Sequence, residues 1–151
     1  MPASKQLRTS PRKPQPAVGL LAIGTCGPWE ISVDQAISGR PRWFAQIEGP
    51  SVYLYFEIRS LNVVGEAARL LSEETGGLRA VAANGKPNGP LTLGKDKSAP
   101  VRLLRDDEFE DRYFLVVEAK NGAVARFTIA GNDRAQLADC LRQINVDIAA
   151  Q

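Results

Sequence analysis

Apolar and polar residues alternate along much of the chain, and this alternation predicts β-strands. A compact apolar run begins at Ala17, and Trp29–Asp34 then alternates strictly between apolar and polar side chains. Further alternating segments cover Arg42–Glu48 and Ser51–Arg59, with Gly and Pro between them. Strands joined by short turns form antiparallel meanders, so we expect four antiparallel strands in the first part of the chain.

A helical spacing of apolar residues follows the fourth expected strand. Asn62 is a suitable N-cap for a helix from about Val63 to Glu74. A second helix is expected after Gly131, with Asn132 or Asp133 as its cap. Its apolar residues are spaced by four, three and four positions and form one stripe: Leu137, Leu141, Ile144 and Ile148.

The second half of the chain repeats the order of the first. Short strands are expected over Leu91–Gly94, Val101–Asp106, Arg112–Lys120 and Ala123–Ala130. Asn121-Gly122 predicts a type I′ hairpin turn between the last two, because both central residues of that turn have positive φ. Internal repetition of this kind constrains architecture strongly.

These patterns predict an α+β protein made of two ββββα repeats, with antiparallel sheets that are each covered on one face by a helix. We expect a single domain over residues 17–150, with repeats at 17–75 and 90–150 and a linker at 76–89. Residues 1–16 are rich in proline, lysine and arginine and predict a disordered basic tail. Whether the two sheets join edge to edge or pack face to face stays open.

The sheet faces that point away from the helices are expected to carry aromatic and arginine side chains, because side chains alternate along a strand. Single-stranded nucleic acid is bound by such faces, since bases stack on aromatic rings and cations follow the phosphates. We therefore predict a single-stranded DNA- or RNA-binding protein. Its candidate binding residues are Arg42, Phe44, Tyr53, Tyr55, Arg59, Arg112, Phe114 and Arg126.

Two observations leave other functions open. Cross-strand aromatic pairs also stabilise sheets without any ligand, so the alternative is a protein-interaction or scaffold module whose aromatic faces form oligomer or partner interfaces. The charge also opposes nucleic acid, since residues 30–151 carry a net charge of −2 and residues 1–29 carry +4. Glu48, Glu57 and Glu118 are expected on the same faces as the arginines. A third class of function is a small-molecule-binding domain whose site lies in the cleft between the two repeats.

Composition argues against catalysis and metal binding. The chain has no histidine, and its two cysteines, Cys26 and Cys140, are far apart in sequence. We therefore expect no enzyme, no cofactor and no metal site, and buried reduced thiols with a disulfide as the alternative. The acidic cluster at 105–111 is interpreted as a solvated hairpin tip. With no apolar run of about 18 residues, we expect a cytoplasmic protein without a membrane segment, with association with the nucleoid left open.

The element order resembles families that use a four-stranded sheet and a helix twice. These are the Whirly proteins, the PUR-repeat proteins and the related coactivator fold, in which two chains supply the two units. The resemblance covers residues 17–150 and includes the closing pattern FTIAGNDRAQLADCLRQI. It is topological, and the Lys-Gly-Lys-Ala-type strand signature of Whirly proteins is absent. The resemblance implies binding of single-stranded DNA or RNA and frequent oligomerisation.

Overall fold

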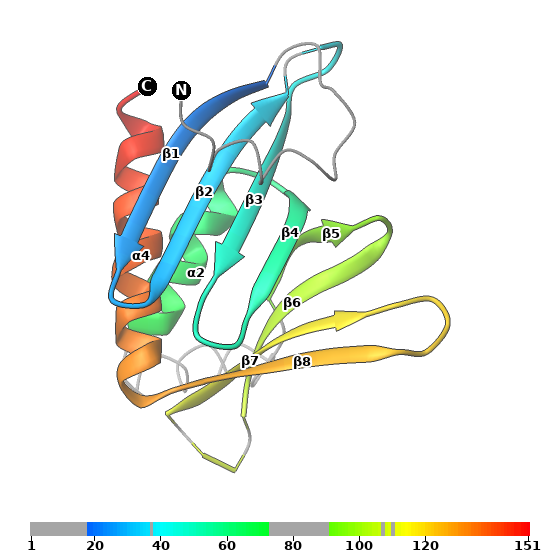
Figure 1. Ribbon diagram of the computed structural model, residues 1–151, viewed down its shortest axis with the longest axis vertical. Coiled ribbons are helices and arrows are strands. Elements are labelled where there is room, and N and C mark those ends of the chain that lie inside the picture. Colours follow the sequence, from blue (N-terminus) through cyan, green and yellow to red (C-terminus); the bar gives the residue numbers. More distant parts are fainter. Residues whose placement is uncertain (1–17, 37, 73–90, 107, 110) are drawn as a thin grey trace, which may run out of the picture.

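A computed structural model describes residues 18–36, 38–72, 91–106, 108–109 and 111–151. The expected basic tail and linker lie outside these residues. Among these residues, four strands precede one helix and four more precede another, close to the positions that the alternation predicts (Figure 1). The strands are β1 (Val18–Cys26), β2 (Trp29–Ala36), β3 (Arg42–Glu48), β4 (Tyr53–Ile58), β5 (Leu91–Asp96), β6 (Ala99–Arg105), β7 (Arg112–Glu118) and β8 (Val124–Ala130). The helices are α2 (Asn62–Ser72) and α4 (Gly131–Ala149).

All eight strands form one antiparallel sheet in chain order. The general class α+β is confirmed, but the expected pair of sheets, one in each of two ββββα repeats, is wrong. The halves are joined where β4 pairs with β5 through Glu57↔Lys95 and Ile58↔Gly94. Pairing these two strands removes two sheet edges that separate repeats would have left open.

Glycine at position 94 makes the junction between β4 and β5 possible. A Cβ atom at this position would lie 1.9 Å from the carbonyl oxygen of Glu57. Glycine is the residue found where two backbones approach this closely. The sequence contains Gly94, but it does not show that Glu57 lies next to this glycine. The junction depends on a contact between residues that α2 separates in the sequence.

The helices are not distributed one to each half. The two helices pack against each other; among the strands, α4 contacts chiefly β1 and β2, and α2 contacts β5. Figure 1 shows the two helices side by side behind the first four strands. The helix α2 therefore covers strands that precede it, as expected, whereas the expectation is wrong for α4, which covers β1 and β2 instead of β5–β8 (Figure 1). An apolar helix stripe needs only some apolar surface to cover, and the continuous sheet offers α4 the strands at the opposite end of the chain.

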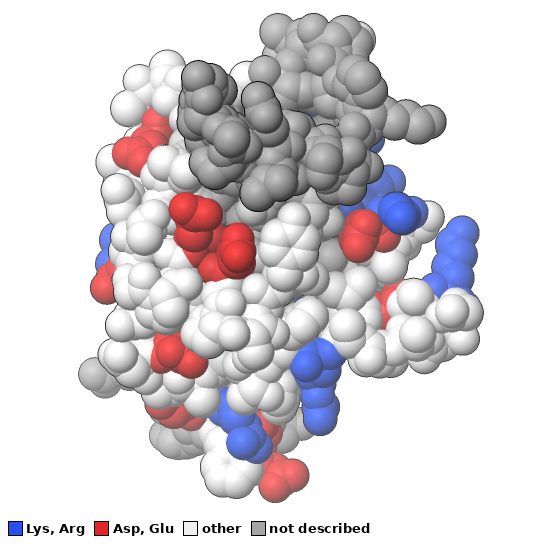
Figure 2. Space-filling model, in the orientation of Figure 1, with Lys and Arg blue, Asp and Glu red and all other residues white. Residues whose placement is uncertain are grey.

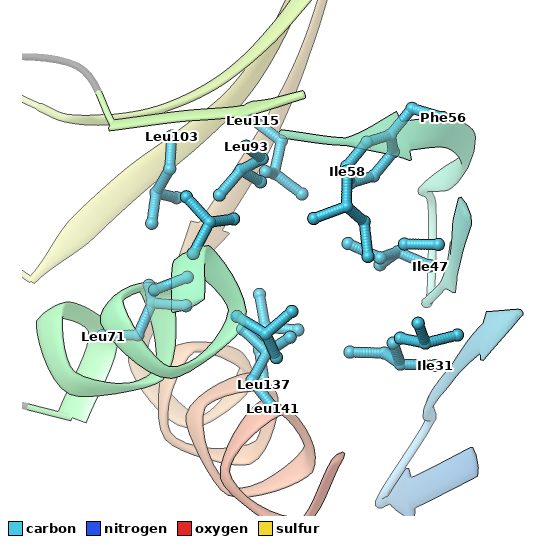
Figure 3. A pocket seen from close by; sticks show the side chains of 15 residues that line it. Ile31, Ile47, Phe56, Ile58, Leu71, Leu93, Leu103, Leu115, Leu137 and Leu141 are labelled. Carbon is cyan, nitrogen blue, oxygen red and sulfur yellow. The ribbon is translucent and has the colours of Figure 1, made fainter. Parts of the chain in front are cut away.

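The hydrophobic core lies between this sheet and the helix pair (Figure 3). It contains a cavity of about 30 Å³ that is lined only by apolar side chains, among them Ile31, Phe56, Leu103 and Leu137. A water molecule needs polar partners, so a small apolar cavity stays empty. We therefore interpret this cavity as a packing defect and not as a ligand site.

The start of α4 differs from the expected side-chain cap. The N-cap is Ala130, and it makes no side-chain capping hydrogen bond. Instead, the backbone N–H of Gly131 donates to Asp111 Oδ2 at 3.0 Å, and Arg134 Nε donates to Asp111 Oδ1 at 2.6 Å. A carboxylate 20 residues earlier thus satisfies a donor at the positive end of the helix.

The hairpin between β7 and β8 is confirmed, but its turn type is not I′. Only Gly122 has a positive φ, of 88°, and Ala119 N donates to Ala123 O at 2.8 Å. Asn121 instead uses its side-chain oxygen to accept from Ala123 N at 2.9 Å. The longer loop needs positive φ at one residue only, and glycine supplies it.

Both cysteines are free thiols, but only Cys140 is buried as expected, and Cys26 is partly exposed. Cys140 is buried, and burial raises the pKa of its thiol to about 12, with Cys26 adding to the effect. Neither helix in the described part of the chain combines the length and the apolar character that a membrane crossing needs.

Candidate nucleic-acid interface

The sheet surface opposite the helices is the candidate interface. Because the sheet is continuous, the outward side chains of both halves lie on one surface. We call the outer surface of β2, β3 and β4 the β2–β4 face and that of β6, β7 and β8 the β6–β8 face. Figure 2 shows one group of acidic side chains left of the centre of the view, and other acidic side chains spread toward its margins, where lysine and arginine side chains also lie.

The β2–β4 face carries a stacked aromatic pair. The rings of Phe44 and Tyr55 have their centroids 5.9 Å apart and are inclined by 7°. The Arg42 guanidinium lies 5.1 Å from the Phe44 ring centroid and donates two hydrogen bonds to Glu57, at 3.0 and 3.1 Å. That arginine is therefore neutralised by a carboxylate, which leaves it less charge to offer to a phosphate.

The same face is acidic and partly closed. Glu30 stands directly opposite Glu48 in the pairing of β2 with β3. At its centre Ser32, Asp34 and Gln46 are buried although they point away from the core. Stacking surfaces for bases must be open and surrounded by positive charge, so this half suits nucleic acid poorly.

The β6–β8 face combines one aromatic ring with two arginines. The Arg126 guanidinium lies 4.4 Å from the centroid of the Phe114 ring, and that of Arg112 lies 5.8 Å from it. Cross-strand pairing positions them, since Phe114 is opposite Thr128 and Val116 is opposite Arg126. A guanidinium group over a ring offers its remaining donors at the ring edge, but Arg112 also donates to a carboxylate.

Arg112 is held in place by a second ring and a carboxylate. It lies 4.0 Å from the centroid of the Phe109 ring, and its Nε donates to Asp106 Oδ2 at 2.6 Å. The backbone N–H of Glu108 donates to the other oxygen of Asp106 at 2.8 Å, and this bond, followed by that from Arg112, lowers the pKa of Asp106. Arg112 therefore orders the β6–β7 connection and contributes little net charge.

Two arginines on the β6–β8 face, Arg102 and Arg126, differ from Arg112 in their contacts. Arg102 and Arg126 are opposite Val116 on its two sides. Within the described ranges, neither has a carboxylate oxygen within 4.0 Å. Among the described residues, this face thus places two arginines without a close carboxylate beside an aromatic ring, and it also carries Glu118 at the end of β7.

The remaining predicted residues lie apart from both clusters. Tyr53 is 58% exposed near the end of the β2–β4 face, and its hydroxyl donates to Gln46 Oε1 at 3.4 Å. Arg59 lies at the junction of β4 and β5, where its backbone N–H donates to Leu93 O at 2.8 Å. The eight predicted residues therefore form two clusters and two separate positions.

Sequence reasoning missed two members of this surface. Arg102 alternates with the buried Val101 and Leu103, so the same alternation argument could have found it. Phe109 is 54% exposed and lies inside the acidic cluster, where the sequence carries no periodic signal. Its contact with Arg112 depends on how the β6–β7 connection folds.

The acidic cluster has structural contacts rather than a metal-binding arrangement. Asp106 holds Arg112, and Asp111 holds the start of α4 and Arg134. Among the residues described, no group of three or more His, Cys, Asp or Glu side chains is placed to hold a metal ion. The interpretation of this cluster as a fully solvated tip is therefore incomplete, because two of its carboxylates connect separate elements.

Comparison of the chain with family models, with curated proteins and with solved structures finds no match. The resemblance in element order therefore stays a prediction, and the functional argument depends on the outer surface of the sheet.

Proposed function

We propose that this protein binds single-stranded DNA or RNA without catalysing a reaction, through the β6–β8 face. The observation that carries the proposal is the Phe114 ring flanked by Arg126 at 4.4 Å and Arg112 at 5.8 Å on an outward sheet surface. A base stacked on an aromatic side chain contributes about 1–3 kcal/mol, and arginine adds cation–π and phosphate contacts. The proposal includes a cytoplasmic location, in which the protein would meet single-stranded nucleic acid.

Fluorescence anisotropy with a labelled single strand of about thirty nucleotides tests the proposal, since that length covers several sites of the usual size. We expect binding that weakens as salt rises and that exceeds binding to a duplex of the same sequence. No binding at low salt by folded protein contradicts the proposal.

A double variant locates the binding surface. Phe114→Ala with Arg126→Ala removes the ring and its free arginine. Val146→Ala with Arg142→Ala is the matched control, because both residues lie on α4, Val146 is 60% exposed and Arg142 is paired with Asp139. We expect loss of binding in the first variant only. Equal affinities in both variants place the binding surface elsewhere.

The second candidate is a protein-interaction module, and the sheet edges favour it. β1 and β8 end the sheet in chain order, and each pairs with one other described strand. Leu20 on β1 and Val124 on β8 are more than half exposed. An edge strand with exposed apolar residues can add a strand from a partner or from a second copy. Light scattering that shows a stable oligomer, unaffected by salt or nucleic acid, supports this candidate instead.

A further inference from the structure

We infer that the sugar–phosphate backbone of the bound strand crosses the sheet over the β4–β5 junction, along a row formed by Arg59, Arg102 and Arg126. This inference depends on the proposed function and adds the path and the phosphate contacts. It also assigns a role to Arg59 and Arg102, which lie outside both aromatic clusters.

Strand pairing aligns the three arginines. Arg59 directly follows β4, and its backbone N–H donates to Leu93 O; Thr92, the residue before Leu93 in β5, is opposite Arg102. Arg102 is opposite Val116, which is opposite Arg126. The row therefore runs across β4, β5, β6, β7 and β8, about 19 Å along the sheet at roughly 4.8 Å per strand spacing.

The surface is hollowed where the row crosses the junction. A hollow of about 450 Å³ is lined by residues of β4, β5 and the β5–β6 turn, including Arg59, Thr92, Lys95 and Ser98. Two cations and two hydroxyl groups line one depression, which suits a phosphate group.

The carboxylate in the hollow is already engaged. Glu57 also lines it, and it accepts two hydrogen bonds from Arg42. Those hydrogen bonds, with smaller contributions from nearby cations that include Lys95, lower the pKa of Glu57. Its charge is thereby balanced by Arg42, whereas Arg59 and Arg102 have no carboxylate oxygen within 4.0 Å among the described residues.

Contacts to phosphates make the binding affinity depend on salt concentration, whereas base stacking does not. For single strands, log K falls with log salt by about 0.7 for each phosphate contact. Arg59→Ala and Arg102→Ala should each reduce the slope by about 0.7, so that the loss of affinity between 50 and 200 mM salt becomes about 2.6-fold smaller. Phe114→Ala should weaken binding with an unchanged slope.

Lysine variants and a distant arginine are the controls. Arg59→Lys and Arg102→Lys keep the charge and should keep the wild-type slope, which separates loss of charge from misfolding. Arg142→Ala, on α4, should also leave the slope unchanged.

The outcomes separate the path from the function. Wild-type slopes in both alanine variants, with binding still lost in Phe114→Ala, overturn the path and leave the proposed function standing. If Arg142→Ala reduces the salt slope as much as Arg59→Ala and Arg102→Ala do, the path is also overturned, because the reduction then reflects the net charge of the protein. Failure of the unmodified protein to bind a single strand overturns both.

Discussion

The two halves of the outer sheet surface both carry aromatic and arginine side chains, but the charged groups around these side chains differ. On the β2–β4 face, the aromatic pair Phe44–Tyr55 is next to an arginine neutralised by Glu57. On the β6–β8 face, the Phe114 ring is next to Arg126, which has no carboxylate partner in the described part of the chain. Aromatic content alone therefore does not distinguish the two faces, and the proposed nucleic-acid surface is chosen by the charged groups beside each ring.

The β2–β4 and β6–β8 faces belong to one sheet because β4 pairs with β5. Gly94→Ala should separate β4 from β5, because the new Cβ would lie 1.9 Å from the Glu57 carbonyl oxygen. We expect a loss of about 3 kcal/mol in the free energy of unfolding, at the upper end for overpacking, measured by urea denaturation. Gly19→Ala is the control, since no heavy atom lies within 4 Å of its Cβ position. Equal stability of the two variants contradicts the junction.

A direct test of the comparison substitutes one ring in each half. Phe114→Ala should weaken single-strand binding by about 1–3 kcal/mol, the range for loss of one stacked base. Tyr55→Ala should weaken it less, because the acidic β2–β4 face repels phosphates. Anisotropy titrations of both variants measure the difference. A larger loss for Tyr55→Ala reverses the assignment of the two faces.

The acidic character of the β2–β4 face can be reduced at one position. Glu48→Gln removes one of two carboxylates that stand directly opposite each other, Glu30 and Glu48. We expect a gain in stability of about 0.2–1 kcal/mol, the range for cross-strand pairs. Binding should tighten by about twofold at low salt, since one repulsive charge is lost. Thermal melts and anisotropy check the two effects, and weaker binding in this variant contradicts the electrostatic argument.

The smallest expected effect is the acid dependence of the Glu57–Arg42 pair. Its hydrogen bonds to Arg42 place the pKa of Glu57 below the ordinary 4.5. The pair therefore stabilises the fold fully above about pH 4.5, and this contribution is lost as the pH falls through the lower folded-state value. Solvent screens a pair at the protein surface, so we expect only a small change in stability. Glu57→Gln should make the fall in stability at acid pH shallower, and an unchanged pH profile contradicts the role of the pair.

Local patterns in the sequence are sufficient to predict the positions of the strands and the side of the sheet to which their side chains point. Alternation placed Phe44, Tyr55, Phe114 and Arg126 outward, and the contacts among them agree with that. Arg102 obeys the same rule and could have been included. These features depend only on residues close together in the chain.

Features that depend on distant residues could not be predicted in this way. The pairing of β4 with β5 crosses a helix and the residues after it, and α4 covers β1 and β2 from the other end of the chain. Asp111 replaces the local cap expected at Asn132 or Asp133. The distribution of charge around each ring follows from strand register, which links Glu57 to Arg42 and leaves Arg126 unpaired within the described residues.

The measurement that tests the central claim most directly is an amide NMR titration of the protein with an unlabelled single-stranded oligonucleotide. The account predicts that chemical-shift changes gather on β6, β7 and β8 and around Arg59, with smaller changes on β2 and β3 and none on the far side of α4. Changes confined to the β2–β4 face, or no changes at low salt, would contradict it.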